Sequence, residues 1–198
     1  MRVVVGHEPV VRQGQQAGCG GTWWVRRAVG AEGVSPVVLA GFRAGCGGAG
    51  GTAAAALEEL RGCGPSAGET RAALLGFVDT YLSFCLGNPE VPALWMRSWL
   101  SEGAELAEIE AEFAGPLVAE VAAGVRTVLD RAGIGAGVDV EMLVFTIVWT
   151  VHSFGQAGVI DPAGRRLGPR DLASLDRFRR HLHTVVAGVL DRAGGDGA

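Results

Sequence analysis

The sequence predicts an all-α fold, and three observations support this prediction. Apolar residues recur with helical spacing in several long segments from residue 69 onward. Glycine and proline interrupt these segments where helices would begin and end. Apolar residues also make up 48% of the 198-residue chain, which is enough to build a sizeable core. We therefore expect helices packed around an apolar core.

Three helices are expected in the first part of this helical region, over residues 69–86, 90–100 and 104–132. Pro89 separates the first two helices, and the acidic residue at the start of the second suits the positive end of a helix. Pro116 must kink or divide the third helix, because a proline inside a helix removes a hydrogen bond and clashes with the preceding turn.

Two further apolar helices are expected over residues 139–154 and from residue 171 onward, with loops over residues 133–137 and 162–169. The first of them is apolar nearly all round, so it should be buried on more than one side. The second carries one long apolar stripe. Two such helices can pair with their copies across a two-fold axis. The predicted homodimer contacts are Val151, Leu175, Phe178, Leu182, Val186 and Val189.

The composition of the chain changes near residue 65. Residues 1–65 contain 15 of the 32 glycines, with six arginines against four acidic residues. Residues 66–198 contain 11 arginines against 17 acidic residues. A weakly basic head on an acidic body suits a DNA-binding module joined to a module of another kind. We therefore predict a head over residues 1–65 and a helical ligand-binding and dimerisation domain over residues 66–198.

Within the head, residues 25–39 predict a helix, a turn over residues 32–35 and a short second helix. Ser35 would cap this second helix, and Pro36 would occupy its first position. The segment from residue 41 to residue 51 contains six glycines, which oppose helix formation because glycine loses much backbone entropy on folding.

Several classes of protein are not expected. The four cysteines lack a Cys-x-x-Cys spacing and lie far in sequence from the histidines, so neither a metal site nor a cofactor is predicted. No run of about 18 apolar residues occurs, so no membrane span is expected. A charge at Glu8 interrupts the apolar start of the chain, which is unlike a signal peptide. These features predict a cytoplasmic protein.

The sequence of residues 25–39, Val-Arg-Arg-Ala-Val-Gly-Ala-Glu-Gly-Val-Ser-Pro-Val-Val-Leu, resembles the helix-turn-helix of the TetR family of bacterial repressors. The body is similar to that family in its Asn-Pro-Glu break at residues 88–90, its tryptophan-containing helix and its two long apolar helices at the end. The resemblance implies a homodimeric, ligand-responsive repressor that binds operator DNA and performs no chemistry on its ligand. The residues implied to contact DNA are Arg26, Arg27, Val34, Ser35, Pro36, Val37 and Val38.

The resemblance also implies a cavity for a small apolar or aromatic ligand, lined by aromatic side chains. The residues expected to bind this ligand are Phe77, Tyr81, Trp95, Trp99, Phe113, Trp149 and His152. Plain core packing is the alternative for each of these side chains, since most apolar aromatics at helical spacing belong to a core.

The head departs from the family pattern after Leu39. The family continues with a tyrosine, a His-Phe pair and a lysine that contacts DNA phosphate, whereas residues 40–46 here read Ala-Gly-Phe-Arg-Ala-Gly-Cys. The head is therefore degenerate and expected to be partly disordered. We hypothesise that parts of residues 1–65 are read from a shifted frame, and translation of the other two frames of the encoding DNA would test this.

Two rival functions remain open at this point. The first is a helical small-molecule-binding or dimerisation protein that has lost DNA binding, for which the degenerate head argues. The second is a small helical enzyme that uses the aromatic cavity. The acidic residues that could serve such an enzyme occur in a regular run that is typical of a solvated helix face, so no enzyme is predicted. These are Glu102, Glu105, Glu108, Glu110 and Glu112.

Overall fold

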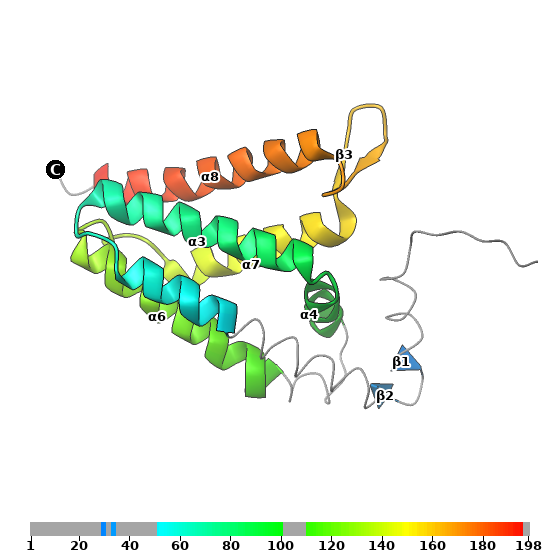
Figure 1. The fold of residues 1–198 in the computed structure, drawn as a ribbon, viewed down its shortest axis with the longest axis horizontal. Helices are drawn as coiled ribbons and strands as arrows, with labels where there is room; N and C mark the ends of the chain where they lie inside the picture. The colour runs from blue at the N-terminus through cyan, green and yellow to red at the C-terminus, as the bar shows by residue number, and fades with distance from the viewer. Residues whose placement is uncertain (1–28, 31–32, 35–50, 101–109, 196–198) are drawn as a thin grey trace, which may run out of the picture.

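The computed structural model describes residues 29–30, 33–34, 51–100 and 110–195 (Figure 1). The described chain is mostly helical, which confirms the predicted all-α class. None of the described helices is both long enough and apolar enough to cross a membrane.

The described part of the body begins with a helix over residues 51–61. Its side chains Leu57 and Leu60 are 0% and 1% exposed and belong to the main apolar core. This helix lies on the N-terminal side of the predicted boundary at residue 65, yet it packs with the residues that follow that boundary. The body therefore includes at least residues 51–61.

Helix α3 (Ala67–Gly87) begins with a capping box. The backbone N–H of Glu69 donates to the Ser66 hydroxyl at 3.2 Å, and the Glu69 carboxylate accepts from the Ser66 backbone N–H at 3.4 Å. These bonds satisfy donors that the first turn of a helix leaves without partners. Leu74, Val78 and Leu82 follow at four-residue spacing and are buried, so one face of α3 runs along the core.

Helix α4 (Glu90–Leu100) follows the break at Asn88. The predicted third helix is divided: residues 101–109 lie outside the described chain, a π-helical turn η1 covers Glu110–Ala114, and helix α6 covers Gly115–Arg131. Pro116 stands at the start of α6, where the missing N–H of proline removes no helical hydrogen bond.

Helix α7 (Val140–Ala157) is capped by Asp139, whose carboxylate accepts from the Met142 backbone N–H at 3.0 Å. It ends at Gly158, whose backbone φ of +65° suits glycine. The loop predicted over residues 162–169 is only partly correct. Arg166–Leu167 form strand β4, which pairs antiparallel with strand β3 (Val159–Ile160).

Helix α8 (Leu172–Gly195) is capped by Asp171, whose side chain accepts from the Ser174 backbone N–H at 2.7 Å. It packs along α3 and α7 on the side away from α6 and the helix over residues 51–61 (Figure 1). Phe178 stacks on Phe154 of α7 with ring centroids 4.0 Å apart.

This packing corrects the predicted dimer contacts, because the chain's own helices cover them. Four of the six side chains are buried, namely Val151, Phe178, Leu182 and Val186. The other two, Leu175 and Val189, are half-buried and pack against the same core. An apolar stripe requires a cover, but here that cover comes from α3 and α7 of the same chain.

The head contributes one described feature, a pair of antiparallel strands that are each two residues long. Strand β1 (Val29–Gly30) pairs antiparallel with strand β2 (Gly33–Val34). The predicted helix through Val29 and Gly30 is therefore wrong. Two glycines disfavour a helix here, and the β-branched side chains of the valines favour extended backbone.

Candidate functional site

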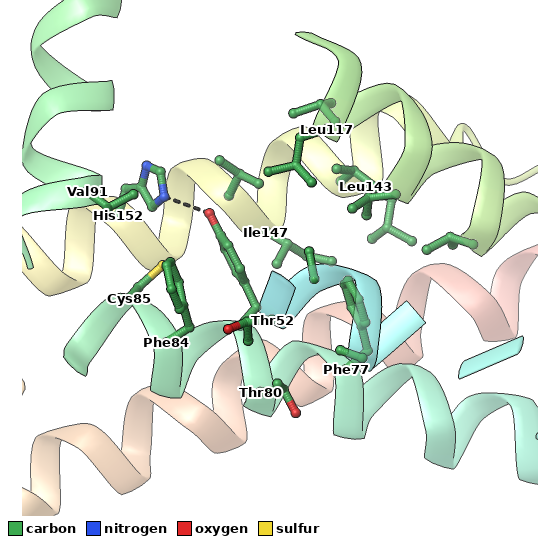
Figure 2. Close-up of a pocket in the computed structure, with 18 of the residues that line it drawn as sticks. Thr52, Phe77, Thr80, Phe84, Cys85, Val91, Leu117, Leu143, Ile147 and His152 are labelled. Carbon is green, nitrogen blue, oxygen red and sulfur yellow. Dashed lines mark hydrogen bonds between the residues drawn. The ribbon is translucent and has the colours of Figure 1, made fainter. Parts of the chain in front are cut away.

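An apolar cavity lies between the helix over residues 51–61 and helices α3, α4, α6 and α7 (Figure 2). It offers about 80 Å³ to the centres of water-sized molecules. A single water needs roughly 10–15 Å³ by the same measure, so the cavity has room for a small organic molecule. Each of these five helices contributes side chains to the wall.

Four of the predicted ligand-binding residues line this cavity, namely Phe77, Tyr81, Trp95 and His152. The structure therefore brings together side chains that lie up to 75 residues apart in sequence, from α3, α4 and α7. The side chains of Trp99 and Phe113 lie outside the described part of the structure.

Trp149 does not line the cavity, which corrects its predicted role. It lies on the outer face of α7, where it is 37% exposed and stacks on Phe145 with ring centroids 6.1 Å apart. Phe145 is 50% exposed, and Met142, one turn earlier on the helix, is 55% exposed. Helix α7 thus has an inner face towards the cavity and core and an apolar outer face.

Helix α6 supplies lining residues that were not predicted from the sequence, because the predicted cavity wall was mainly aromatic and these residues are aliphatic. Leu117, Val121 and Val125 of α6 follow each other at four-residue spacing and line the cavity. Thr52 and Ala56 have the same spacing on the helix over residues 51–61. This periodicity was visible in the sequence, but aliphatic residues so spaced form filled cores as readily as cavity walls.

A hydrogen bond between α3 and α7 crosses one part of the cavity. The Tyr81 hydroxyl lies 2.6 Å from Nε2 of His152 (Figure 2). The Trp95 ring meets the His152 ring edge to face, with centroids 5.6 Å apart. The His152 side chain is 1% exposed. The histidine ring is therefore held in one orientation by contacts from two helices.

Burial keeps the titratable groups of this cavity uncharged near neutral pH. Burial lowers the pKa of His152 from 6.5 to about 4. Burial likewise raises the pKa of the Cys85 thiol to about 12 and the pKa of Tyr81 well above its usual 10. In each case a charged form would lose its hydration without gaining a counter-ion. None of the described lining residues carries a formal charge at pH 7.

The residues predicted to contact DNA are not brought together as a site by the described chain. Val34 lies in strand β2. The other six, Arg26, Arg27, Ser35, Pro36, Val37 and Val38, lie outside the described residues.

Residues 64–68 read Gly-Pro-Ser-Ala-Gly, a Gly-x-Ser-x-Gly pattern that also occurs around the nucleophile of α/β-hydrolases. In those enzymes the serine stands on a sharp turn from a strand into a helix. Here the helix over residues 51–61 precedes the pattern, and the Ser66 hydroxyl caps α3 while bonded to the Glu69 carboxylate at 2.5 Å. The geometry of Ser66 is that of a helix cap.

No group of three or more histidine, cysteine or acidic side chains is placed to hold a metal ion within the described ranges. Comparison with protein-family models, with curated proteins and with solved structures finds no match to this chain. The resemblance to the TetR family therefore stays a prediction, and the cavity is the feature on which a functional proposal depends.

Proposed function

We propose that this protein is a ligand-responsive DNA-binding repressor of the TetR type that acts as a homodimer. The observation that carries this proposal is the position of the helix over residues 51–61. It contributes Thr52, Ala53 and Ala56 to the cavity wall, and residues 40–50 separate it in sequence from the predicted helix-turn-helix at residues 25–39. A ligand in the cavity would press on the helix that joins the cavity to that segment.

The charge distribution agrees with this assignment. Residues 1–50 contain five arginines and two glutamates, whereas the whole chain has a net charge of −4. Arginines near the N-terminus would attract phosphate, while the acidic body would stay away from the duplex. In one conformation of the dimer the two heads would be spaced so that they do not fit DNA. A ligand that binds this conformation more tightly would increase its population and release the operator.

The dimer in this proposal uses the outer face of α7 in place of the stripe on α8. Met142, Phe145 and Trp149 share this face and are all more than one-third exposed. In a two-fold dimer two copies of α7 would pack these side chains against each other. We expect Phe145→Glu to dissociate the dimer in sedimentation experiments while its circular dichroism stays helical. A dimer that persists in this variant would contradict this interface.

Selection from random duplex DNA with the full chain tests the repressor assignment. Two heads on a two-fold axis should enrich a symmetric site whose halves lie about one helical turn, roughly 34–36 Å, apart. A variant with Arg26→Ala and Arg27→Ala should lose affinity for the enriched duplex, whereas Arg177→Ala on α8 serves as a matched control. If no sequence is enriched over the starting pool, the proposal fails.

One observation favours a second candidate, a helical small-molecule-binding protein that does not bind DNA. Strand β1 of the β1–β2 hairpin covers Val29 and Gly30, where the predicted helix-turn-helix would place helical backbone. This candidate predicts that the cavity binds a ligand and that the DNA selection enriches nothing. The two candidates therefore differ in the DNA experiment and agree on the cavity.

A further inference from the structure

The polar side-chain atoms of the cavity gather mainly at the Tyr81 hydroxyl. This hydroxyl lies 2.6 Å from His152 Nε2, and Cys85, four residues further along α3, also lines the cavity. Apart from this cluster and two threonines, the described wall consists of aliphatic and aromatic side chains. Thr80 already donates its hydroxyl hydrogen to the backbone carbonyl of Gly76 at 3.1 Å. Tyr81 keeps hydrogen-bonding capacity beside His152, so it is the candidate partner for a polar group on a ligand.

The cavity also discriminates by charge. Because burial holds His152, Cys85 and Tyr81 in their uncharged forms at pH 7, the described wall offers no counter-ion. A carboxylate or an ammonium group would lose its hydration on entry without gaining an opposite charge, which is strongly unfavourable. An uncharged ligand has no such cost.

The Tyr81–His152 hydrogen bond also limits the kind of polar group that fits. A phenol oxygen can donate one hydrogen bond and accept two, and a neutral histidine has one donor and one acceptor nitrogen. If Nε2 of His152 accepts, Tyr81 can accept from the ligand; if Nε2 donates, Tyr81 can donate to the ligand. A ligand hydroxyl serves both tautomers because it both donates and accepts, whereas a carbonyl serves only one.

We propose that the cavity binds an uncharged, mainly apolar small molecule with a single hydroxyl group, and that this hydroxyl bonds to Tyr81 beside His152. The proposal rests on the proposed function in one respect, since it takes the cavity to be the ligand site. It adds the chemical class of the ligand and the residue that selects it.

A series of three probes of matched shape tests this proposal: toluene, p-cresol and p-toluate. Calorimetric titration of the full chain at pH 7 should show that p-cresol binds about fivefold more tightly than toluene, the usual effect of one hydrogen bond. p-Toluate should bind at least about tenfold more weakly than p-cresol, because it carries a charge. Equal affinities, tightest binding of p-toluate, or no binding by any probe would overturn the proposal.

Variants of the polar wall residues test which side chain gives the cavity its preference for p-cresol over toluene. In Tyr81→Phe the ratio of the p-cresol and toluene affinities should fall to about one. In Thr52→Val and Thr80→Val, which remove the other hydroxyls from the wall, that ratio should stay as in the wild type. A ratio that survives in Tyr81→Phe, or disappears in either threonine variant, would overturn the role of Tyr81.

The chain offers a second readout that needs no variant, because Tyr81 is its only tyrosine. Tyrosine labelled with ¹³C at Cζ gives one NMR signal, whose position reports hydrogen bonding at the hydroxyl. p-Cresol should move this signal, and toluene should move it less. Identical shifts with the two probes would overturn the proposal. Because no DNA takes part, failure here leaves the DNA selection to decide the repressor assignment separately.

Discussion

Other helices cover α3 and α7 on two sides. The two sides differ in how completely side chains fill the space between the helices. On one side α8 covers both helices, with Phe178 stacked on Phe154 and with Leu182 and Val186 buried at 1% and 0% exposure. On the other side the helix over residues 51–61 and α6 leave a cavity of about 80 Å³. Figure 1 shows α3 and α7 between these two covers.

The difference teaches that similar apolar stripes can serve opposite purposes. The α8 side is packed by aliphatic and aromatic groups, so its side chains gain dispersion contacts all round. The cavity side places Tyr81 and His152 in contact with unfilled space, at the expense of stability. Natural proteins accept such local cost at functional sites. Four expected outcomes, from the largest effect to the smallest, test this contrast.

The largest expected effect is the loss of packing on the α8 side. Leu182→Ala should lower the free energy of unfolding by about 2–5 kcal/mol, because a well-packed site cannot collapse around the missing atoms. Leu117→Ala on the cavity wall should lower it by less than half as much, since Leu117 already borders open space. Urea unfolding measures both variants. Equal losses would mean that the two sides are packed alike.

The second expected effect is a pH dependence that arises on the cavity side. His152 has a pKa of about 4 when folded and near 6.5 when unfolded, so the unfolded chain binds more protons between these values. Its contribution is complete above pH 6.5 and is lost as the pH falls towards 4, in total about 3 kcal/mol. When urea unfolding is measured across this pH range, the free energy of unfolding should change less with pH for His152→Gln than for the wild type. Parallel pH profiles of the two proteins would contradict the burial of a neutral histidine.

The third comparison adds volume to each side in turn. Val186→Phe should lower the free energy of unfolding by about 1–3 kcal/mol, because Val186 is fully buried and a larger ring would strain the core. Val148→Phe places the same added volume beside the cavity and should change stability less, while blocking p-cresol. Thermal unfolding and titration separate the two effects. If Val148→Phe were as destabilising as Val186→Phe, the cavity could not accept a ring.

The smallest expected effect concerns the contacts that Asp79 of α3 makes with Arg179 and His183 of α8. Asp79 lies 3.1 Å from Nε of Arg179 and 3.0 Å from Nε2 of His183. These side chains are roughly one-third exposed, so solvent screens the pairs. Asp79→Asn should therefore cost at most about 1 kcal/mol in urea unfolding. A loss comparable to that of Leu182→Ala would show that charge, rather than packing, attaches α8.

Much of the helical layout could be predicted from the sequence because its signals are local. The spacing of Leu74, Val78 and Leu82 indicated α3, and Asp139 and Asp171 marked the starts of α7 and α8. Caps and periodicity act over a few residues, so a sequence records them directly.

Which helix covers each apolar face could not be predicted, because the answer depends on residues far apart in the sequence. The stripe through Leu182 and Val186 shows that a cover exists, but not whether α3 or a second copy provides it. Trp149 and Trp95 are both tryptophans in apolar helices, yet one faces outward and the other lines the cavity. The orientation of such a side chain depends on how the helices are rotated against each other, which four-residue spacing does not determine.

The most direct test of the two-sided account is a titration of methyl-labelled protein with p-cresol, followed by NMR. The account predicts that the methyl signals of Leu143, Ile147 and Val148 on the cavity side shift as p-cresol binds. It predicts that the signals of Leu182 and Val186 on the α8 side stay in place. Shifts of equal size on both sides, or shifts only on the α8 side, would contradict it.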